Sequence, residues 1–362
     1  MANSIRCAVI GYGAMHNFGW AHCAWISHTP ELELVGVCDI DPERTAAARR
    51  EWPGIATWNS TARMYDEGEI DLVSIVTPHF THCPLALEAF EAGKHVVVEK
   101  AMCLNVAEAT AMIEAAEAAG KTLAVHHNRR HDGDFRRIRQ LVADGAIGQL
   151  FQIDLQAGGY RDPEHGWYTE KAKGGGAFYF WGPHAVDWVL TLVGTKMTGV
   201  TGFFHKLVWD HVDIEDQVRA LIHFEDGVVA DVTWSHICAA PGPLWRILGT
   251  GGAIIGTGGA TRGYEHAIST PPQGSVKLIR ISDRGRKREE MEVPNLGNDW
   301  DCYWQDLADH LLRGAPVPVS GHEGRRTIAV LETAERSSRS GRTEPVPYED
   351  ATPGPCAPAS SP

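Results

Sequence analysis

Lys100 is the residue whose type and position most directly suggest chemistry in this chain. It follows Glu99 and the apolar run Val96-Val97-Val98. A short valine run bounded by charge predicts a buried parallel strand, and open α/β sheets bind ligands beside the carboxyl ends of such strands. The sequence therefore places an amine where it could reach a bound cofactor, although a lysine at a strand end can equally be solvated.

A turn that suits a dinucleotide follows the first strand-like segment. Gly11-Tyr12-Gly13 allows a tight turn, and its backbone N–H groups could approach a pyrophosphate at the start of the next helix. His16 replaces the third glycine of the G-x-G-x-x-G pattern, and Gly19 takes the close-packing position three residues later. We therefore expect a longer loop than usual.

The ends of two further strands predict the rest of a cofactor site. Asp39 ends the second strand, where a carboxylate can accept both ribose hydroxyl groups of NAD and would repel the additional phosphate of NADP. A turn aspartate before Pro42 is the structural alternative. The loop from Thr77-Pro78 to His82 ends another strand and could wall the nicotinamide. NAD is the cofactor that this pattern favours.

The first third of the chain must supply the strands that carry these residues. Short apolar segments alternate there with helical patterns rich in alanine, leucine and glutamate, which is the rhythm of β-α-β units around a parallel sheet. Asn105 is a plausible cap for one of these helices, and Gly93 and Gly120 end two of them. The strand candidates are residues 7–10, 34–38, 72–77, 95–99 and 122–126.

The chain after about residue 128 has a different texture. Longer alternating segments predict a mostly antiparallel sheet. One helix within it is expected to begin at Gly182-Pro183 and end at Gly194, with an apolar stripe from Val186 to Val193 and with His184 and Asp187 on the opposite side. Two more helical patterns cover residues 300–312 and 325–337. The strand candidates are residues 149–156, 200–208, 217–224, 228–236 and 276–281.

Composition narrows the classes of protein that fit. The 362 residues are 43% hydrophobic and 22% charged, and the formal net charge of -13 would repel nucleic acid and anionic membranes. No stretch reaches the ~18 to 20 apolar residues of a membrane span. The eight cysteines are scattered without a C-x-x-C pair, and the chain enters a strand-like segment almost at once. We therefore expect a cytoplasmic protein without a leader, a membrane or a nucleic-acid partner.

Together these motifs resemble the Gfo/Idh/MocA family of NAD(P)-dependent sugar and cyclitol oxidoreductases. The resemblance runs from residue 5 to about 347 and implies an α/β fold. It implies an N-terminal NAD-binding Rossmann domain over residues 1–127 and an α+β domain over residues 128–349. The second domain would have an open, mostly antiparallel sheet, bind the substrate and form a homodimer or homotetramer. Residues 350–362 have too little apolar content to pack and are expected to be a disordered tail. The motifs are Gly11-Tyr12-Gly13, Thr77-Pro78 with His82, residues 92–100, and residues 174–176 with Gly182, His184 and Asp187.

The resemblance also implies the roles of individual residues. Lys100 and His184 would be catalytic, since oxidising a hydroxyl group requires a base for its proton and a cation for the developing alkoxide. The substrate would contact His184, Trp167, Tyr168 and Arg130, for which a solvated arginine is the alternative. The cofactor would contact Gly11, Tyr12, Gly13, Asp39, Thr77, Pro78, His82, Glu99 and Lys100.

Two positions depart from the family pattern. Ala101 replaces the proline that usually follows the lysine, and Phe180 replaces an aspartate four residues before the histidine. We hypothesise that Asp187, one helical turn after His184, orients the imidazole instead.

The expected function is an NAD-dependent transfer of hydride between a secondary hydroxyl group of a sugar, glycoside or cyclitol and the nicotinamide. An NAD-retaining glycosidase, acting by oxidation, elimination and addition, is the alternative. A non-catalytic NAD or sugar sensor is less favoured because Lys100 and His184 are both present. The histidine pairs lack a third ligand at convincing spacing, so no metal is predicted.

Overall fold

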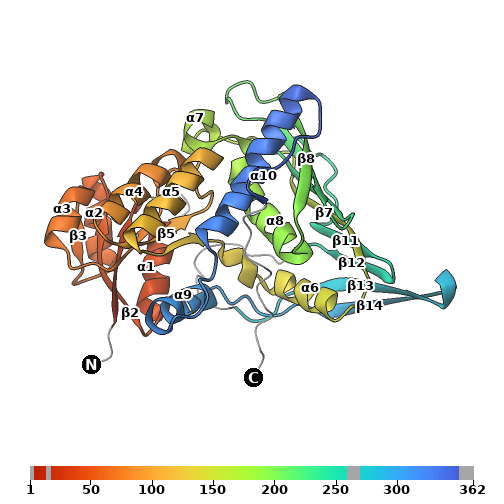
Figure 1. Cartoon of the computed structure of the whole chain (residues 1–362), viewed down its shortest axis with the longest axis horizontal. Coiled ribbons are helices and arrows are strands. Elements are labelled where there is room, and N and C mark those ends of the chain that lie inside the picture. Colours follow the sequence, from red (N-terminus) through yellow and green to blue (C-terminus); the bar gives the residue numbers. More distant parts are fainter. Residues whose placement is uncertain (1–3, 14–17, 259–269, 350–362) are drawn as a thin grey trace.

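The first part of the chain folds into a parallel six-stranded sheet surrounded by helices, as the alternating pattern predicts (Figure 1). In this computed structural model, which describes residues 4–13, 18–258 and 270–349, the strand order is β3-β2-β1-β4-β5-β6. Ligands bind beside the carboxyl ends of strands where such an order reverses, between β1 and β4. The strands are β1 (Ile5–Ile10), β2 (Leu32–Cys38), β3 (Ala56–Trp58), β4 (Leu72–Ile75), β5 (His95–Glu99) and β6 (Leu123–His126).

The helices of this part begin and end close to where their capping residues predict. The Asn105 side chain accepts the backbone N–H of Glu108 at 2.9 Å, and Gly120 ends the same helix in the left-handed region. All five strand candidates are confirmed, whereas three-residue β3 is too short to show a pattern. The helices are α1 (Phe18–His28), α2 (Pro42–Glu51), α3 (Thr61–Glu67), α4 (His82–Glu91) and α5 (Val106–Ala119), with short turns η1 (His79–Thr81) and η2 (Asn128–His131).

The second part forms an eight-stranded sheet of order β14-β13-β12-β11-β7-β10-β9-β8. Only β7 and β10 pair in parallel, so the mostly antiparallel prediction is confirmed. The pattern missed β11, β12 and β14, of which β14 is almost wholly exposed and charged. The strands are β7 (Leu150–Gly158), β8 (Met197–His205), β9 (Gln217–Phe224), β10 (Val229–Ser235), β11 (Trp245–Gly249), β12 (Gly252–Gly256), β13 (Ser275–Ser282) and β14 (Lys287–Pro294).

The helix that carries His184 begins earlier than predicted. This helix, α8 (Ala177–Val193), contains Pro183 in its interior, and the expected start at Gly182-Pro183 is therefore wrong. Its first N–H group, on Ala177, donates to the Glu215 carboxylate at 3.1 Å. Because Glu215 lies far away in the sequence, no local pattern could have shown this cap. Both sides of α8 are buried, including His184 and Asp187, which were expected opposite the apolar stripe.

The C-terminal helices pack back onto the parallel sheet. Helix α10 lies between the two sheets and packs against α5, α8 and β8 (Figure 1). The segment before it pairs with the last parallel strand, since the Val125 N–H donates to the Val319 carbonyl at 3.0 Å. The remaining helices are α6 (Gly133–Ala143), α7 (Lys171–Gly174), α9 (Asp301–Arg313) and α10 (Gly321–Ser340), with turns η3 (Trp167–Thr169) and η5 (Asp283–Gly285).

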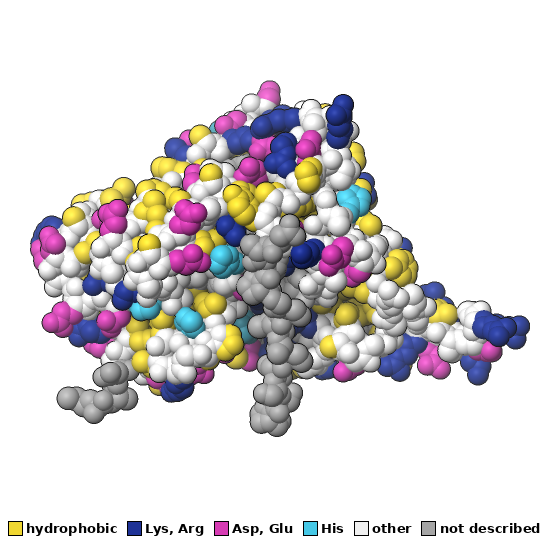
Figure 2. Space-filling view, viewed as in Figure 1, with side chains coloured by type: hydrophobic (Ala, Val, Ile, Leu, Met, Phe, Trp, Pro, Cys, Tyr) yellow, Lys and Arg dark blue, Asp and Glu magenta, His cyan; other side chains and the backbone are white. Residues whose placement is uncertain are grey.

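The hairpin of β13 and β14 extends away from the body of the molecule, and Lys and Arg side chains gather at its end (Figure 2). Among the described helices none is long and apolar enough to cross a membrane. His16 and the predicted tail over residues 350–362 lie outside the described residues.

Candidate active site

The glycine turn after β1 is packed so tightly that two of its positions require glycine. Gly11 has φ +99°, and a Cβ atom there would lie 2.2 Å from the Val76 carbonyl oxygen. A Cβ atom on Gly19, in the first turn of α1, would lie 2.5 Å from the Gly11 carbonyl oxygen. Gly19 therefore has the close-packing role expected of it. No atom of the described residues lies within 4 Å of a Cβ atom placed on Gly13, which suits the approach of a pyrophosphate to the backbone.

Asp39 lies directly against this turn. Its carboxylate accepts the backbone N–H of Tyr12 at 2.6 Å and that of Asp41 at 2.9 Å. A carboxylate offers about four acceptor positions, so these bonds fix Asp39 and leave capacity for ribose hydroxyl groups. The Tyr12 side chain turns away toward α2, where its hydroxyl group contacts Glu51 and accepts from the Trp52 indole at 3.0 Å. Tyr12 thus contributes its backbone to the turn.

His82 joins the carboxyl ends of β4 and β5. Its ring nitrogens lie 2.7 Å from the Thr77 carbonyl oxygen and 2.8 Å from the Ala101 carbonyl oxygen. The ring is fully buried and holds the Thr77-Pro78 loop beside Lys100, whose peptide bond to Ala101 is cis. His82 is therefore placed to support the wall of a cofactor site through its neighbours.

His79 ties this loop to the second part of the chain. Its Nδ1 donates to the Gly174 carbonyl at 2.9 Å, and its Nε2 accepts the N–H of Ala101 at 3.2 Å. Burial lowers the pKa of His79 to about 3, which keeps the ring neutral and able to accept. Both histidines of this pair are thus engaged with backbone groups.

A cavity of about 90 Å³ lies where α1, the end of β5, η2 and α8 meet. It collects several side chains that carry N–H groups, one carboxylate and several aromatic rings. The residues that line it are Phe18, Glu99, Lys100, Asn128, Arg129, Phe180, Trp181, His184 and Trp300.

Lys100 reaches across this cavity to α8. Its Nζ donates to the Phe180 carbonyl at 3.0 Å and lies 5.6 Å from the centre of the Phe180 ring. Burial lowers the pKa of Lys100, and the charge of Glu99 opposes that shift. The backbone of α8 and an aromatic face thus contact the ammonium group at the position where an aspartate was expected.

His184 enters the same cavity as a neutral base. Its side chain is buried, and its Nδ1 has no hydrogen-bond partner among the described residues. Burial holds the pKa of His184 well below its usual value, and the charges of Lys100 and Arg129 lower it further. A neutral imidazole beside an ammonium group can accept a proton from a bound hydroxyl group.

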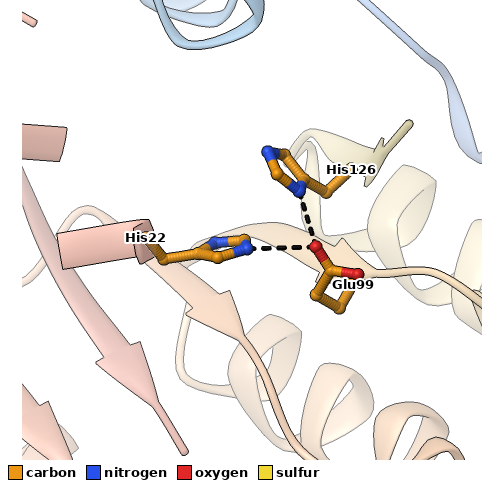
Figure 3. Close-up of side chains that lie close together, drawn as sticks. All are labelled: His22, Glu99 and His126. Atoms are coloured by element: carbon orange, nitrogen blue, oxygen red, sulfur yellow. Dashed lines mark hydrogen bonds and ion pairs between the residues drawn. The ribbon is translucent and has the colours of Figure 1, made fainter. Parts of the chain in front are cut away.

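The Glu99 carboxylate lies between two histidines and is bound by both (Figure 3). Its Oε1 accepts from His22 Nε2 at 3.1 Å and from His126 Nδ1 at 2.6 Å, while its Oε2 accepts the backbone N–H of Lys100 at 3.0 Å. Burial alone would raise the pKa of Glu99, but the bonds from His126 and His22 bring it well below its usual range. Glu99 is therefore an ionised group held behind the amine.

The same three side chains form the single cluster in the described part of the chain with metal-ligand spacing. The arrangement of protons accounts for them without a cation. Burial lowers the pKa of His22 to about 4, so its neutral ring donates from Nε2 to Glu99 and accepts from the Ser74 hydroxyl at Nδ1, 2.7 Å away. A metal-bound His126 would need an acceptor for its Nε2, and the described residues supply none. We read the cluster as a hydrogen-bond network.

Arg130 is not placed at the cavity, and Asp187 does not orient His184. The Arg130 guanidinium binds both Asp187 oxygens, at 2.6 and 2.8 Å, and binds Glu323 at 2.9 Å. Burial alone would raise the pKa of Asp187, but Arg130 brings it below its usual range. Both expectations are corrected, because the Arg130 guanidinium and the Asp187 carboxylate form a buried ion pair with each other.

The two aromatic residues expected to contact the substrate pack against other rings outside the cavity lining. Trp167 packs against the His79 ring at 4.8 Å, and Tyr168 packs against the Phe180 ring at 5.5 Å. Neither is among the lining residues. The sequence reasoning missed Phe18, Asn128, Arg129, Trp181 and Trp300, of which Asn128 and Arg129 follow the end of β6 and could have been found by the strand-end rule.

Two family models match the chain. The NAD-binding Rossmann fold of the Gfo/Idh/MocA oxidoreductase family matches residues 5–127. The Gfo/Idh/MocA C-terminal domain matches residues 135–255. The matched segments contain the glycine turn, Lys100 and His184.

Individual relatives agree with this assignment. The chain is 25% identical to the NADP(+) scyllo-inositol 2-dehydrogenase IolW of Bacillus subtilis, over 94% of this chain and 96% of IolW. It is 29% identical to the D-glucoside 3-dehydrogenase of Escherichia coli, over 53% of this chain and 55% of that enzyme. The solved structure of yvaA from Bacillus subtilis has the same fold, with a TM-score of 0.86, 24% identity and coverage of 96% and 99% of the two chains.

Proposed function

The chain belongs to the Gfo/Idh/MocA family of oxidoreductases, whose Rossmann domain binds NAD(P), and on that premise we propose that it is an NAD-dependent dehydrogenase. Its substrate would be a secondary alcohol of a sugar, glycoside or cyclitol. Relatives named as an inositol dehydrogenase and a glucoside dehydrogenase support this substrate class.

The observation that carries the proposal is the pairing of Lys100 with His184 in one cavity. His184 is neutral, and its buried Nδ1 has no partner in the part of the chain that the structure describes, so it is available to take the proton of the substrate hydroxyl group. The Lys100 ammonium, fixed by the Phe180 carbonyl, stabilises the negative charge that develops on the same oxygen. The bound dinucleotide supplies the hydride acceptor.

The residues that would hold NAD fit the dinucleotide. Gly11 and Gly19 leave no room for a Cβ atom, whereas the described residues leave space for one at Gly13. Asp39 presents a carboxylate at the end of β2, which favours ribose hydroxyl groups over a phosphate. NAD is therefore the proposed cofactor, although the relative IolW carries NADP(+) in its name.

The cofactor preference can be measured through Asp39. We expect kcat/KM for NAD+ to exceed that for NADP+ by about 10- to 100-fold, because a phosphate beside this carboxylate meets like charge. Asp39→Ser should narrow the ratio, whereas Asp41→Ser, which removes the neighbouring carboxylate, should change it less. A wild-type protein that prefers NADP+ would contradict the assignment.

The reaction itself is tested with purified protein, NAD+ and a panel of sugars, cyclitols and chromogenic glycosides. Reduced cofactor and released aglycone are followed together. We expect net reduced cofactor and a ketone product in equal amounts. Aglycone release without net reduction would replace the dehydrogenase with an NAD-retaining glycosidase. Sugar binding without either product would replace it with a sensor.

A homodimer or homotetramer is part of the proposal. The described helices that contact the eight-stranded sheet lie on one side of it, and no described helix covers the other side (Figure 1). Light scattering coupled to size-exclusion chromatography would measure the mass, and a monomer at micromolar concentration would contradict the proposal.

A further inference from the structure

His127 is a second buried histidine beside His184. It directly follows β6, and only 2% of its surface is exposed. The centres of the two imidazole rings lie 6.0 Å apart, and the ring planes meet at 77°. His127 is not among the residues that line the cavity, so it is placed to act on a bound substrate only through His184.

Both rings carry a buried nitrogen that is left without a bond. The Nδ1 atoms of His127 and His184 have no hydrogen-bond partner among the described residues. Buried polar groups in native proteins are normally bonded, either to the protein or to a water molecule, and exceptions are common where a group has a chemical role. At a centre-to-centre distance of 6.0 Å, one water molecule can bridge the two rings and carry a proton between them.

The surroundings of His184 favour the loss of a proton. Burial holds the pKa of His184 well below its usual value, and the charge of Lys100 lowers it further. Arg129, which is itself paired with Asp132, has the same effect after Lys100. Once His184 has taken the proton of the substrate hydroxyl group, the imidazolium lies beside like charge. The ketone still occupies the cavity at that moment, so the proton needs a path that avoids it.

The charges around His127 favour the gain of a proton. Burial lowers the pKa of His127 as well, but the charge of Asp187 on α8 raises it, and those of Glu99 on β5 and Glu323 on α10 act in the same direction. Arg130 of η2 opposes them and is ion-paired with both Asp187 and Glu323. The field of these groups therefore drives a proton from His184 toward His127.

We propose, building on the proposed dehydrogenase, that His127 relays the substrate proton from His184 to solvent. The substrate gives its hydroxyl proton to His184 and its hydride to NAD+, which leaves a ketone and the reduced cofactor. The His184 imidazolium then gives a proton to Nδ1 of His127, and His127 releases it to solvent beside Glu323, whose side chain is 35% exposed. His184 thereby becomes neutral again, and Asp187 acts on the reaction through His127.

Stopped flow in weakly buffered solution with a pH indicator follows the proton and the reduced cofactor separately. In the wild type we expect proton release and cofactor reduction to occur at the same rate. His127→Gln should leave the first turnover within about twofold of wild type, because His184 still takes the substrate proton, and should slow later turnovers by about 10²-fold. Proton release in this variant should lag behind cofactor reduction.

The outcomes of this experiment separate a relay from a structural role. His322→Gln, which removes a histidine of α10 that pairs with Glu117 at the surface, is the control and should change neither rate. An equal loss in the first and later turnovers of His127→Gln would assign His127 a structural role and overturn the relay. Later turnovers as fast as those of the wild type would overturn it as well.

Nuclear magnetic resonance of the NAD+-loaded protein with ¹⁵N-labelled histidine tests the direction of transfer without turnover. The ring signals are assigned by their loss in His127→Gln and His184→Ala. As the pH falls below 6.5, we expect His127 to gain its proton before His184.

This titration also distinguishes the relay from the dehydrogenase on which it builds. If His127 gains its proton first but no substrate reduces the cofactor, the proton path is kept and the dehydrogenase is rejected. If the cofactor is reduced but His184 gains its proton first, the dehydrogenase is kept and the relay is rejected. No reduction together with earlier protonation of His184 would reject both.

Discussion

Glu99 and Lys100 are adjacent in the chain, yet their side chains occupy two regions of opposite character. Behind the strand, both oxygens of Glu99 accept hydrogen bonds, from His22, His126 and the Lys100 backbone, among aromatic rings, while His126 Nε2 lacks a partner among the described residues. In front of the strand, Lys100 shares a cavity with His184, whose Nδ1 lacks a partner among the described residues. Each region is buried, and each holds charged or titratable groups.

Some buried polar groups in this protein hold the backbone in place, and others are available to react with a substrate. A buried polar group that lacks a partner costs about 1 to 3 kcal/mol, so folding favours networks that are closed. The region in front of the strand carries that cost at His184, which is expected where a substrate completes the bonding. The region behind the strand carries a similar cost at His126 Nε2, but its central carboxylate is fully engaged and fixes the backbone that presents Lys100.

Removal of the His184 imidazole should have the largest effect on turnover. His184→Ala should lower kcat by about 10²- to 10⁴-fold, because the reaction loses its proton acceptor. NAD binding and the unfolding midpoint should change little, since His184 Nδ1 makes no hydrogen bond to the described residues. Steady-state kinetics with the best substrate measures the loss, and added imidazole should restore part of it. Turnover within about twofold of wild type would remove His184 from the mechanism.

Arg130 belongs to a second buried group of charged side chains that bind one another. Arg130→Met leaves the buried Asp187 carboxylate without its partner, and we expect the free energy of unfolding to fall by about 3 to 5 kcal/mol. Urea unfolding measures this loss. Arg137→Met is the control, because this half-buried arginine of α6 donates to the Pro294 carbonyl and to Gln140 rather than to a carboxylate. A double variant that also carries Asp187→Leu should recover part of the loss. If Arg130→Met unfolded like the control, the ion pair would contribute nothing to stability.

Glu99→Gln should have a smaller effect on stability. The amide keeps the shape but places an NH₂ group opposite a donor, so at least one bond of the network is lost and unfolding should become easier by about 1 to 3 kcal/mol. Glu67→Gln, which breaks an exposed ion pair in α3, should cost about 0.5 kcal/mol or less. Equal effects of the two variants in urea would mean that the network is no more stabilising than a surface pair.

The pH profile offers the finest comparison. The pKa of His184 lies well below 6.5, so its base form is present throughout the neutral range and kcat/KM for oxidation should be flat there. The pKa of Lys100 is lowered from 10.5, so activity should fall at high pH as the ammonium group loses its proton, earlier than for a solvated lysine. In Glu99→Gln this fall should move to lower pH, because the Glu99 charge raises the pKa of Lys100. A loss of activity as pH falls through 6.5, or an unmoved alkaline limb, would contradict these assignments.

The sequence predicted the parts of the molecule that depend on neighbouring residues. The glycine turn, Asp39 and Lys100 each follow a strand whose apolar run is visible in the sequence, so their place at the sheet edge could be anticipated. Parts that depend on distant residues could not be. Glu215 caps the start of α8, and Arg130 forms an ion pair with Asp187. Trp300, which lies just before α9, lines the cavity.

Arg129 and Arg130 illustrate the limit most clearly. Both are arginines just after the same strand, and the family resemblance implied Arg130 as the residue that contacts the substrate. The fold turns Arg129 into the cavity and Arg130 toward Asp187 and Glu323. Which of two adjacent side chains lines the cavity is decided by the local backbone of η2, whose short turn carries no strong sequence pattern.

The most direct test of the account is a single-turnover measurement on Lys100→Met. The protein is loaded with NAD+, mixed with excess substrate, and the absorbance of the reduced cofactor is followed in stopped flow. We expect the rate of cofactor reduction to fall by about 10²- to 10³-fold while NAD+ binding and the unfolding midpoint stay unchanged, because only the charge that stabilises the alkoxide is lost. A rate of reduction equal to that of the wild type would show that Lys100 has no part in hydride transfer.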